Sequence, residues 1–76
     1  MKTVSRLIIS NHQVLMGKPI ISGTRISVEH ILRKMAEGAN NEDIKAMYPT
    51  INDEHIFAVL EYAANILSNE ELIEVY

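Results

Sequence analysis

Apolar residues recur at helical spacing in three separate segments between residues 28 and 67. In the first segment they fall at positions i, i+3, i+4, i+7 and i+8, which is the pattern of a helix with one apolar face. These residues are Val28, Ile31, Leu32, Met35 and Ala36. We therefore predict a helix over about residues 28–37.

The two following segments are also predicted to be helical. The second, residues 41–47, is short, and we expect Ile44, Met47 and the adjoining Tyr48 to face inward. The third, from residue 53 to about 67, carries one apolar stripe, made by Ile56, Val59, Leu60, Ala63 and Leu67. Further apolar residues widen it: Phe57, Ala64 and Ile66. Such a helix has more apolar surface to bury than a small monomer can cover.

The residues that flank these segments are typical of helix ends. Ser27, Asn40 or Asn41, and Asn52 are suitable N-caps for the first, second and third helices, because their side chains accept hydrogen bonds from free backbone amides. Gly38 is a natural stop for the first helix. Pro49 ends the second, since the residue before a proline avoids the helical region.

The first 27 residues favour extended structure and turns. Residues 5–9 read as a short strand, and residues 10–12 as a turn or loop. Ile20 and Ile21 are β-branched and favour a second strand. Ser22 and Gly23 indicate a tight turn, and residues 24–26 are expected to be extended again. Gly17 and Gly23 can adopt a positive φ, and Pro19 suits a strand start or edge.

A resemblance to a known family is carried by four stretches of the chain. These are GKPIISGTRISVEHIL from Gly17, then MAEGANNEDI, MYPTI and EHIFAVLEYA. In this order, over about residues 7–67, they resemble the bacterial and archaeal family called domain of unknown function 433. The resemblance implies structural roles for eight motif residues: Gly17, Pro19, Gly23, Thr24, Arg25, Gly38, Tyr48 and Pro49. It also implies a three-helix, homeodomain-like helix-turn-helix fold and an antitoxin role beside a PIN-type nuclease toxin, with no catalytic residues.

The expected fold is mainly α, in a single domain. A short β arm or hairpin, residues 1–27, precedes a three-helix unit, residues 28–68, and a tail, residues 69–76. A chain of 76 residues buries a small core. Since it has no cysteine and no metal-ligand spacing among its three histidines, a second copy of the chain is the expected stabiliser, and we predict a homodimer.

Charge is distributed unevenly along the chain. Residues 1–34 hold six Lys and Arg residues against one Glu, a net charge of +5. Residues 35–76 hold one Lys against nine Asp and Glu residues, a net charge of −8. The total of −3 argues against a strongly basic nucleic-acid binder, whereas halves of opposite sign suggest two surfaces with different partners.

Several classes of function are disfavoured by the sequence. No nucleophile–histidine–acid motif and no phosphate loop is present, so we expect no enzyme activity, no cofactor and no bound metal. No apolar run approaches the ~20 residues of a membrane span, and the start of the chain lacks the features of a signal peptide. We therefore expect a cytoplasmic protein without a membrane partner.

Two binding functions remain. A third hypothesis, a ligand or cofactor sensor, has no positive evidence in the sequence. The first is antitoxin-like: the acidic helical half or the tail binds a basic toxin through Leu72, Ile73, Val75 and Tyr76, apolar anchors ringed by glutamates. The second is DNA-binding regulation through the basic arm, with four candidate contacts: Lys18, Arg25, Arg33 and Lys34. Arg25 has a structural alternative, because it could pair with Glu29 or cap carbonyl groups.

The third predicted helix is a poor reader of DNA. In a helix-turn-helix the first residues of the recognition helix meet the bases, and here these are Asp53, Glu54 and His55. Carboxylates at this position would be repelled by the phosphates, whereas acids at a helix N-terminus stabilise the helix. The basic arm is therefore the expected site of any DNA contact.

Overall fold

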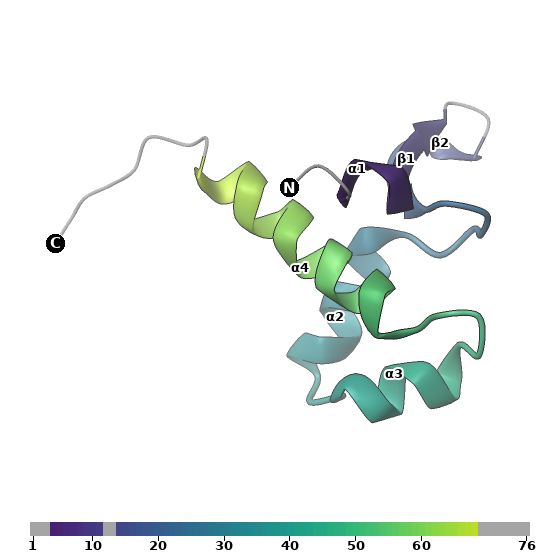
Figure 1. Ribbon diagram of the computed structural model, residues 1–76, viewed down its shortest axis with the longest axis vertical. Coiled ribbons are helices and arrows are strands. Elements are labelled where there is room, and N and C mark those ends of the chain that lie inside the picture. The colour runs from purple at the N-terminus through teal and green to yellow at the C-terminus, as the bar shows by residue number, and fades with distance from the viewer. Residues whose placement is uncertain (1–3, 12–13, 69–76) are drawn as a thin grey trace, which may run out of the picture.

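The structure of the chain is a computed structural model that describes residues 4–11 and 14–68. A short helix, α1 (Val4–Leu7), leads into a two-stranded antiparallel sheet of β1 (Ile8–Asn11) and β2 (Val14–Ile21). Three helices follow, α2 (Val28–Ala36), α3 (Asn41–Met47) and α4 (Asp53–Ser68) (Figure 1). The prediction of a β hairpin followed by a three-helix unit is confirmed.

The N-terminal segment differs from the prediction in one respect. Residues 5–9 were expected to form a strand, but α1 occupies Val4–Leu7 and pairing starts only at Ile8, which faces Ile21. The reason is that β2 ends at Ile21, so residues before Leu7 have no strand to pair with. The last backbone hydrogen bond between the two segments is donated by Ser22 N–H to Leu7 O at 2.8 Å. Leu7 instead packs against the core beneath it.

The hairpin contains an irregularity at two left-handed residues. Ser10 faces Pro19, but the next residue, Asn11, faces Val14, so residues 15–18 of β2 have no counterparts on β1. Within this bulge Met16 has φ 57° and Gly17 has φ 88°. The positive φ expected for Gly17 is therefore confirmed, and a strongly exposed Met16 shares it at the cost that a side chain carries in this region.

The turn after β2 is held by the side chain of Thr24. Its hydroxyl donates to Ile21 O at 2.7 Å and accepts from Ile26 N–H at 3.0 Å, while Gly23 adopts φ 83°. The extended segment expected at residues 24–26 is reduced to a single bridge between Ile20 and Ser27, because this tight turn leaves no room for a longer ladder.

The helix ends follow the predicted capping chemistry. Ser27 Oγ accepts from His30 N–H at 2.9 Å at the start of α2. At its end, Gly38 has φ 110° and donates to Met35 O, while Ala39 donates to Lys34 O, the two bonds of a Schellman motif.

The starts of α3 and α4 each carry a reciprocal cap. Asn40, rather than Asn41, caps α3: its side chain accepts from Asp43 N–H, and the Asp43 carboxylate accepts from Asn40 N–H. At α4, Asn52 Oδ1 accepts from His55 N–H at 3.1 Å and His55 Nδ1 accepts from Asn52 N–H at 3.0 Å. The imidazole of His55 thus completes a capping box, a role usually taken by a carboxylate or amide.

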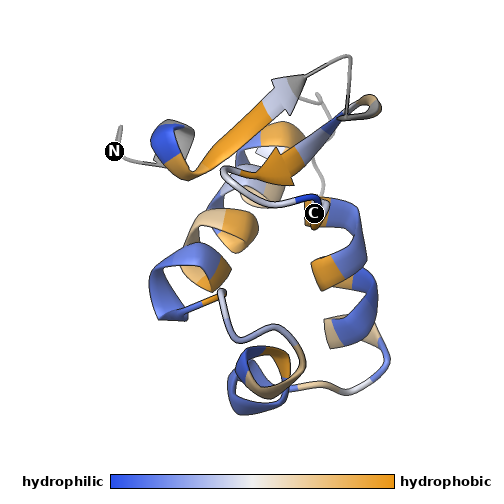
Figure 2. Cartoon of the chain, turned by 90° about the vertical axis from the view of Figure 1, so that its right-hand side faces the viewer, coloured by the Kyte–Doolittle hydropathy of each residue, from blue (hydrophilic) through white to orange (hydrophobic). Residues whose placement is uncertain are grey.

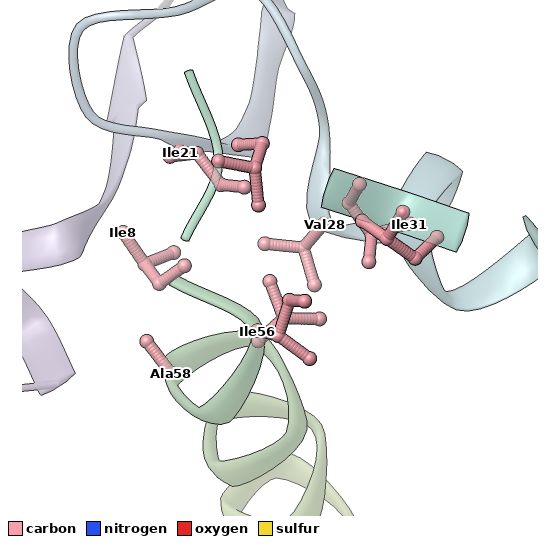
Figure 3. Packing of buried hydrophobic residues seen from close by; sticks show 9 residues of the cluster. Ile8, Ile21, Val28, Ile31, Ile56 and Ala58 are labelled. Carbon is pink, nitrogen blue, oxygen red and sulfur yellow. The ribbon is translucent and has the colours of Figure 1, made fainter. Parts of the chain in front are cut away.

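The core lies where the hairpin and the three larger helices meet (Figures 2 and 3). Its nine buried residues are Ile8, Ile21, Val28, Ile31, Ile44, Ile51, Ile56, Ala58 and Val59. Three large residues predicted to face inward do not: Met47, Leu60 and Leu67 are 43%, 42% and 64% exposed. Leu67 lies in the last turns of α4, which extend beyond α2 and α3 (Figure 1), whereas Met47 and Leu60 lie on sides of their helices that the core does not cover.

Candidate binding surfaces

One face of α4 is apolar and exposed. Phe57 is 60% exposed and, with Leu60, Ala64 and Leu67, it forms a row at spacings of 3, 4 and 3 residues. This α4 row lies on one side of the helix, because residues three and four apart are neighbours on a helix surface. Ile56 is buried beside this row, four residues before Leu60, and Val59 is buried on a different side of the helix, so the apolar surface of α4 is wider than the part that the core covers.

The charged side chains that α4 itself carries are all negative. The helix carries Asp53, Glu54 and Glu61 and no Lys or Arg. Asp53 is held by Lys45 of α3 at 3.0 Å, and Lys45 also contacts Glu42 at 3.2 Å. The hydrogen bond to Asp53, followed by that to Glu42, raises the pKa of the Lys45 ammonium. Glu54 and Glu61 are exposed and give the row an acidic border.

Three of the four residues predicted to contact DNA are paired within the chain. Lys18 and Arg33 both contact the Glu29 carboxylate, at 3.1 and 2.9 Å, and Lys34 lies 3.6 Å from Glu37. The hydrogen bond from Lys18, followed by that from Arg33, lowers the pKa of Glu29. Arg25 does not take the partner suggested for it: Glu29 is occupied by Lys18 and Arg33, and no ion pair of Arg25 occurs among residues 4–11 and 14–68.

Arg25 instead borders a hollow between the start of α2 and the end of α3. The hollow has a volume of about 350 Å³ and is lined by Arg25, Ile26, Ser27, His30 and Tyr48. The Tyr48 hydroxyl is hydrogen-bonded to His30 Nε2, and the two rings meet edge to face with centroids 5.6 Å apart. Sequence patterns could not indicate this pair, because 18 residues separate its members and only the packing of α3 against α2 brings them together.

An apolar groove lies on another side of the molecule, between α2 and the second half of α4. It has a volume of about 410 Å³ and is lined by side chains that include Leu32, Tyr62 and Ile66, with Lys18 among the few polar residues.

The predicted toxin-contact residues Leu72, Ile73, Val75 and Tyr76 lie outside the described residues. Within the described ranges, no three His, Asp or Glu side chains are grouped so as to hold a metal ion. None of the helices in these ranges has the length and hydropathy of a membrane-spanning segment.

A comparison with protein families decides which group the chain falls into. The model of a family described as a protein of unknown function, DUF433, matches residues 8–63, which is well over half of the chain. This chain belongs to the DUF433 family. Neither a curated protein nor a solved structure matches it.

The DUF433 match covers the hairpin, α2, α3 and most of α4. All eight residues of the motifs noted in the sequence fall inside it. Their roles differ: Gly17, Gly23 and Gly38 supply positive φ, and Thr24 closes a turn. Arg25 and Tyr48, by contrast, border the same hollow.

Proposed function

We propose that this DUF433 protein is a non-enzymatic binding protein, the antitoxin-like member of a prokaryotic toxin–antitoxin pair, and that it neutralises a basic PIN-type nuclease. The observation that carries the proposal is the α4 row. Phe57, Leu60 and Leu67 expose large apolar side chains that the core does not use. Clustered exposed apolar side chains of this size are typical of surfaces that bind another protein.

The charges around the row favour a basic partner. Glu54 and Glu61 are exposed beside it, and α4 has no positive side chain to offset them. A partner with Lys or Arg around an apolar pocket would gain both from burial of Phe57 and from attraction at the rim, and the attraction would speed its association. This support is independent of the tail, which stays a second predicted contact.

The proposal is tested with the product of the adjacent gene and two variants of matched exposure. Leu60→Ala removes a row residue, and Met47→Ala removes an equally exposed apolar side chain on α3. We expect Leu60→Ala, and more strongly Phe57→Ala, to weaken binding measured by calorimetry, up to about 30-fold for an anchor residue. Met47→Ala should leave the affinity unchanged. If Leu60→Ala and Met47→Ala changed the affinity equally, the α4 row would not be the surface that contacts the partner.

Deletion of residues 69–76 separates the tail from the α4 row. We expect the shortened chain to keep its melting temperature and to lose binding to the adjacent gene product, since the tail supplies Leu72, Ile73, Val75 and Tyr76. A shortened chain that unfolds would show that the tail is structural. A shortened chain that still binds would leave the α4 row as the whole contact.

DNA binding through the basic arm receives less support from the geometry. Lys18, Arg33 and Lys34 each have a carboxylate partner on α2 or at its end, so their charges are partly neutralised. A duplex attracts proteins through many phosphate contacts at once. The arm offers no comparable ridge of unpaired cations among the residues that the structure describes.

A further inference from the structure

Two residues of the family motifs, Arg25 and Tyr48, have no part in the proposed protein contact. They come from different places in the chain, Arg25 from the turn after β2 and Tyr48 from the C-cap of α3. The fold brings both to the hollow between α2 and α3, where His30 of α2 joins them. We propose that this hollow binds a single phosphate group, with Arg25 and Tyr48 as its main ligands.

Arg25 provides the charge. A guanidinium presents its donors in a planar fork that matches two oxygens of a phosphate. The side chain is exposed, and in the described part of the chain no carboxylate forms an ion pair with it. The nearest acid along α2, Glu29, is held by Lys18 and Arg33. Arg25 is therefore available to an anion in a way that Lys18, Arg33 and Lys34 are not.

Tyr48 provides a positioned hydroxyl. Its ring packs against the core, and its oxygen is fixed by the hydrogen bond with His30 Nε2. When Nε2 carries the proton and donates it to the tyrosine oxygen, the phenolic proton is free to point toward a bound oxygen atom. The pair thus holds a second donor at the rim of the hollow that Arg25 borders.

The start of α2 adds to the positive electrostatic potential at the hollow. Ser27, its N-cap, also lines the hollow, and the positive end of a helix dipole favours an anion there. A tetrahedral phosphate has enough oxygens to meet the guanidinium, the hydroxyl and the helix start together, whereas a carboxylate has two. The volume of about 350 Å³ also leaves room for more of the molecule that carries the phosphate.

The inference does not depend on the antitoxin role, and its test uses the full chain. Amide chemical shifts are followed by NMR during titration with inorganic phosphate, with chloride at matched ionic strength as reference. We expect shifts concentrated at residues 25–30 and at Tyr48. Arg25→Gln should weaken binding about tenfold, and Tyr48→Phe, which keeps the ring, about threefold.

Arg33→Gln is the matched control. It removes the same charge from an exposed arginine nearby, but Arg33 does not line the hollow and is paired with Glu29. Its phosphate affinity should equal that of the parent. The proposal is wrong if Arg33→Gln weakens binding as much as Arg25→Gln, or if shifts spread evenly over all Lys and Arg residues.

Two further titrations identify the source of the phosphate. Adenosine monophosphate and a short 5′-phosphorylated single strand are compared with inorganic phosphate, using the same variants. Tighter binding of either, still dependent on Arg25 and Tyr48, supports the site and assigns a nucleotide or a strand end to it. Binding of inorganic phosphate alone supports the site with a free anion as ligand. Failure of all three probes to bind overturns the proposal.

Discussion

Helices α2 and α4 use their apolar residues differently. On α2, Val28 and Ile31 are buried, Leu32 and Met35 are half-buried against the core, and the charged residues lie outside. On α4, Ile56 and Val59 are just as deeply buried, but Phe57, Leu60 and Leu67 face solvent. The large apolar residues of α2 pack into the core, whereas α4 has a second set of apolar residues that lies outside the core.

The charges make the same distinction. Glu29 of α2 is bonded to Lys18 and Arg33, so that helix is largely neutralised by its own chain. On α4 the exposed acids Glu54 and Glu61 stand beside the uncovered row. Because an uncovered apolar row with charges of one sign does not help a small domain to fold, the comparison points to α4 as the surface for a partner.

The largest expected effect separates the two sets of residues by stability. Ile31→Ala should lower the free energy of unfolding by about 2–5 kcal/mol, because it empties a fully buried site. Leu60→Ala should change it by no more than about 1 kcal/mol, since the side chain is 42% exposed and lies outside the buried core. Urea unfolding of dilute protein measures both. If Leu60→Ala proved as costly as Ile31→Ala, the α4 row would be covered in solution.

Local chemistry made most of the fold predictable. Helix starts depend on one capping side chain, so Ser27 and Asn52 could be assigned from the sequence and the cap of α3 was limited to Asn40 or Asn41. The stop at Gly38 needed only its tolerance of positive φ. The segment at residues 5–9 was harder. Whether Leu7 continues a strand depends on where the partner strand ends, which is a property of the whole hairpin.

The binding surfaces were less predictable. Helical spacing shows on which side of a helix a residue lies, but not whether another part of the protein packs over it. Leu60 and Leu67 share a stripe with buried residues, yet Leu60 lies at the exposed edge of that stripe and Leu67 lies beyond the helices that cover it. The hollow bordered by Arg25, His30 and Tyr48 depends on how α3 packs on α2. No spacing rule along the chain could have placed those three side chains together.

An effect of intermediate size is expected on self-association, which is the alternative role of the α4 row to binding a different protein. We predict that the chain forms a homodimer at micromolar concentration and that light scattering gives twice the chain mass. Pairing of two α4 rows brings Glu54 and Glu61 of both copies together, so added salt should strengthen the dimer by screening their repulsion. Binding of a basic partner should weaken with salt, because screening removes attraction.

The double variant Phe57→Asp, Leu60→Asp tests which surface the dimer uses. It should give a monomer, whereas the control Met47→Asp should leave the dimer intact. A dimer that survives the double change, or that weakens as salt is added, would place self-association on another surface. In that case the α4 row would be left to the partner alone.

The smallest expected effects concern the ion pairs that neutralise α2 and anchor the start of α4. Lys18, then Arg33, lower the pKa of Glu29, so its contribution to stability is present above the unfolded-state pKa and is lost as pH falls through the folded-state value. For Lys45 the sign is opposite: Asp53 raises its pKa, so its contribution is present below the unfolded-state pKa and is lost as pH rises through the folded-state value. Both contributions are therefore present at neutral pH.

Melting temperatures of Glu29→Gln and of the exposed α4 control Glu61→Gln test the first of these signs. Glu29→Gln should melt slightly below the parent at neutral pH, by far less than Ile31→Ala, because solvent-exposed pairs are screened. The difference should vanish in acid, once Glu29 is protonated in both states of the parent. Glu61→Gln should melt at or slightly above the parent temperature, since it removes a charge from a surface that is already acidic. If Glu29→Gln and Glu61→Gln behaved alike at neutral pH, the ion pairs of α2 would contribute nothing, and the contrast in charge between the two helices would have no counterpart in stability.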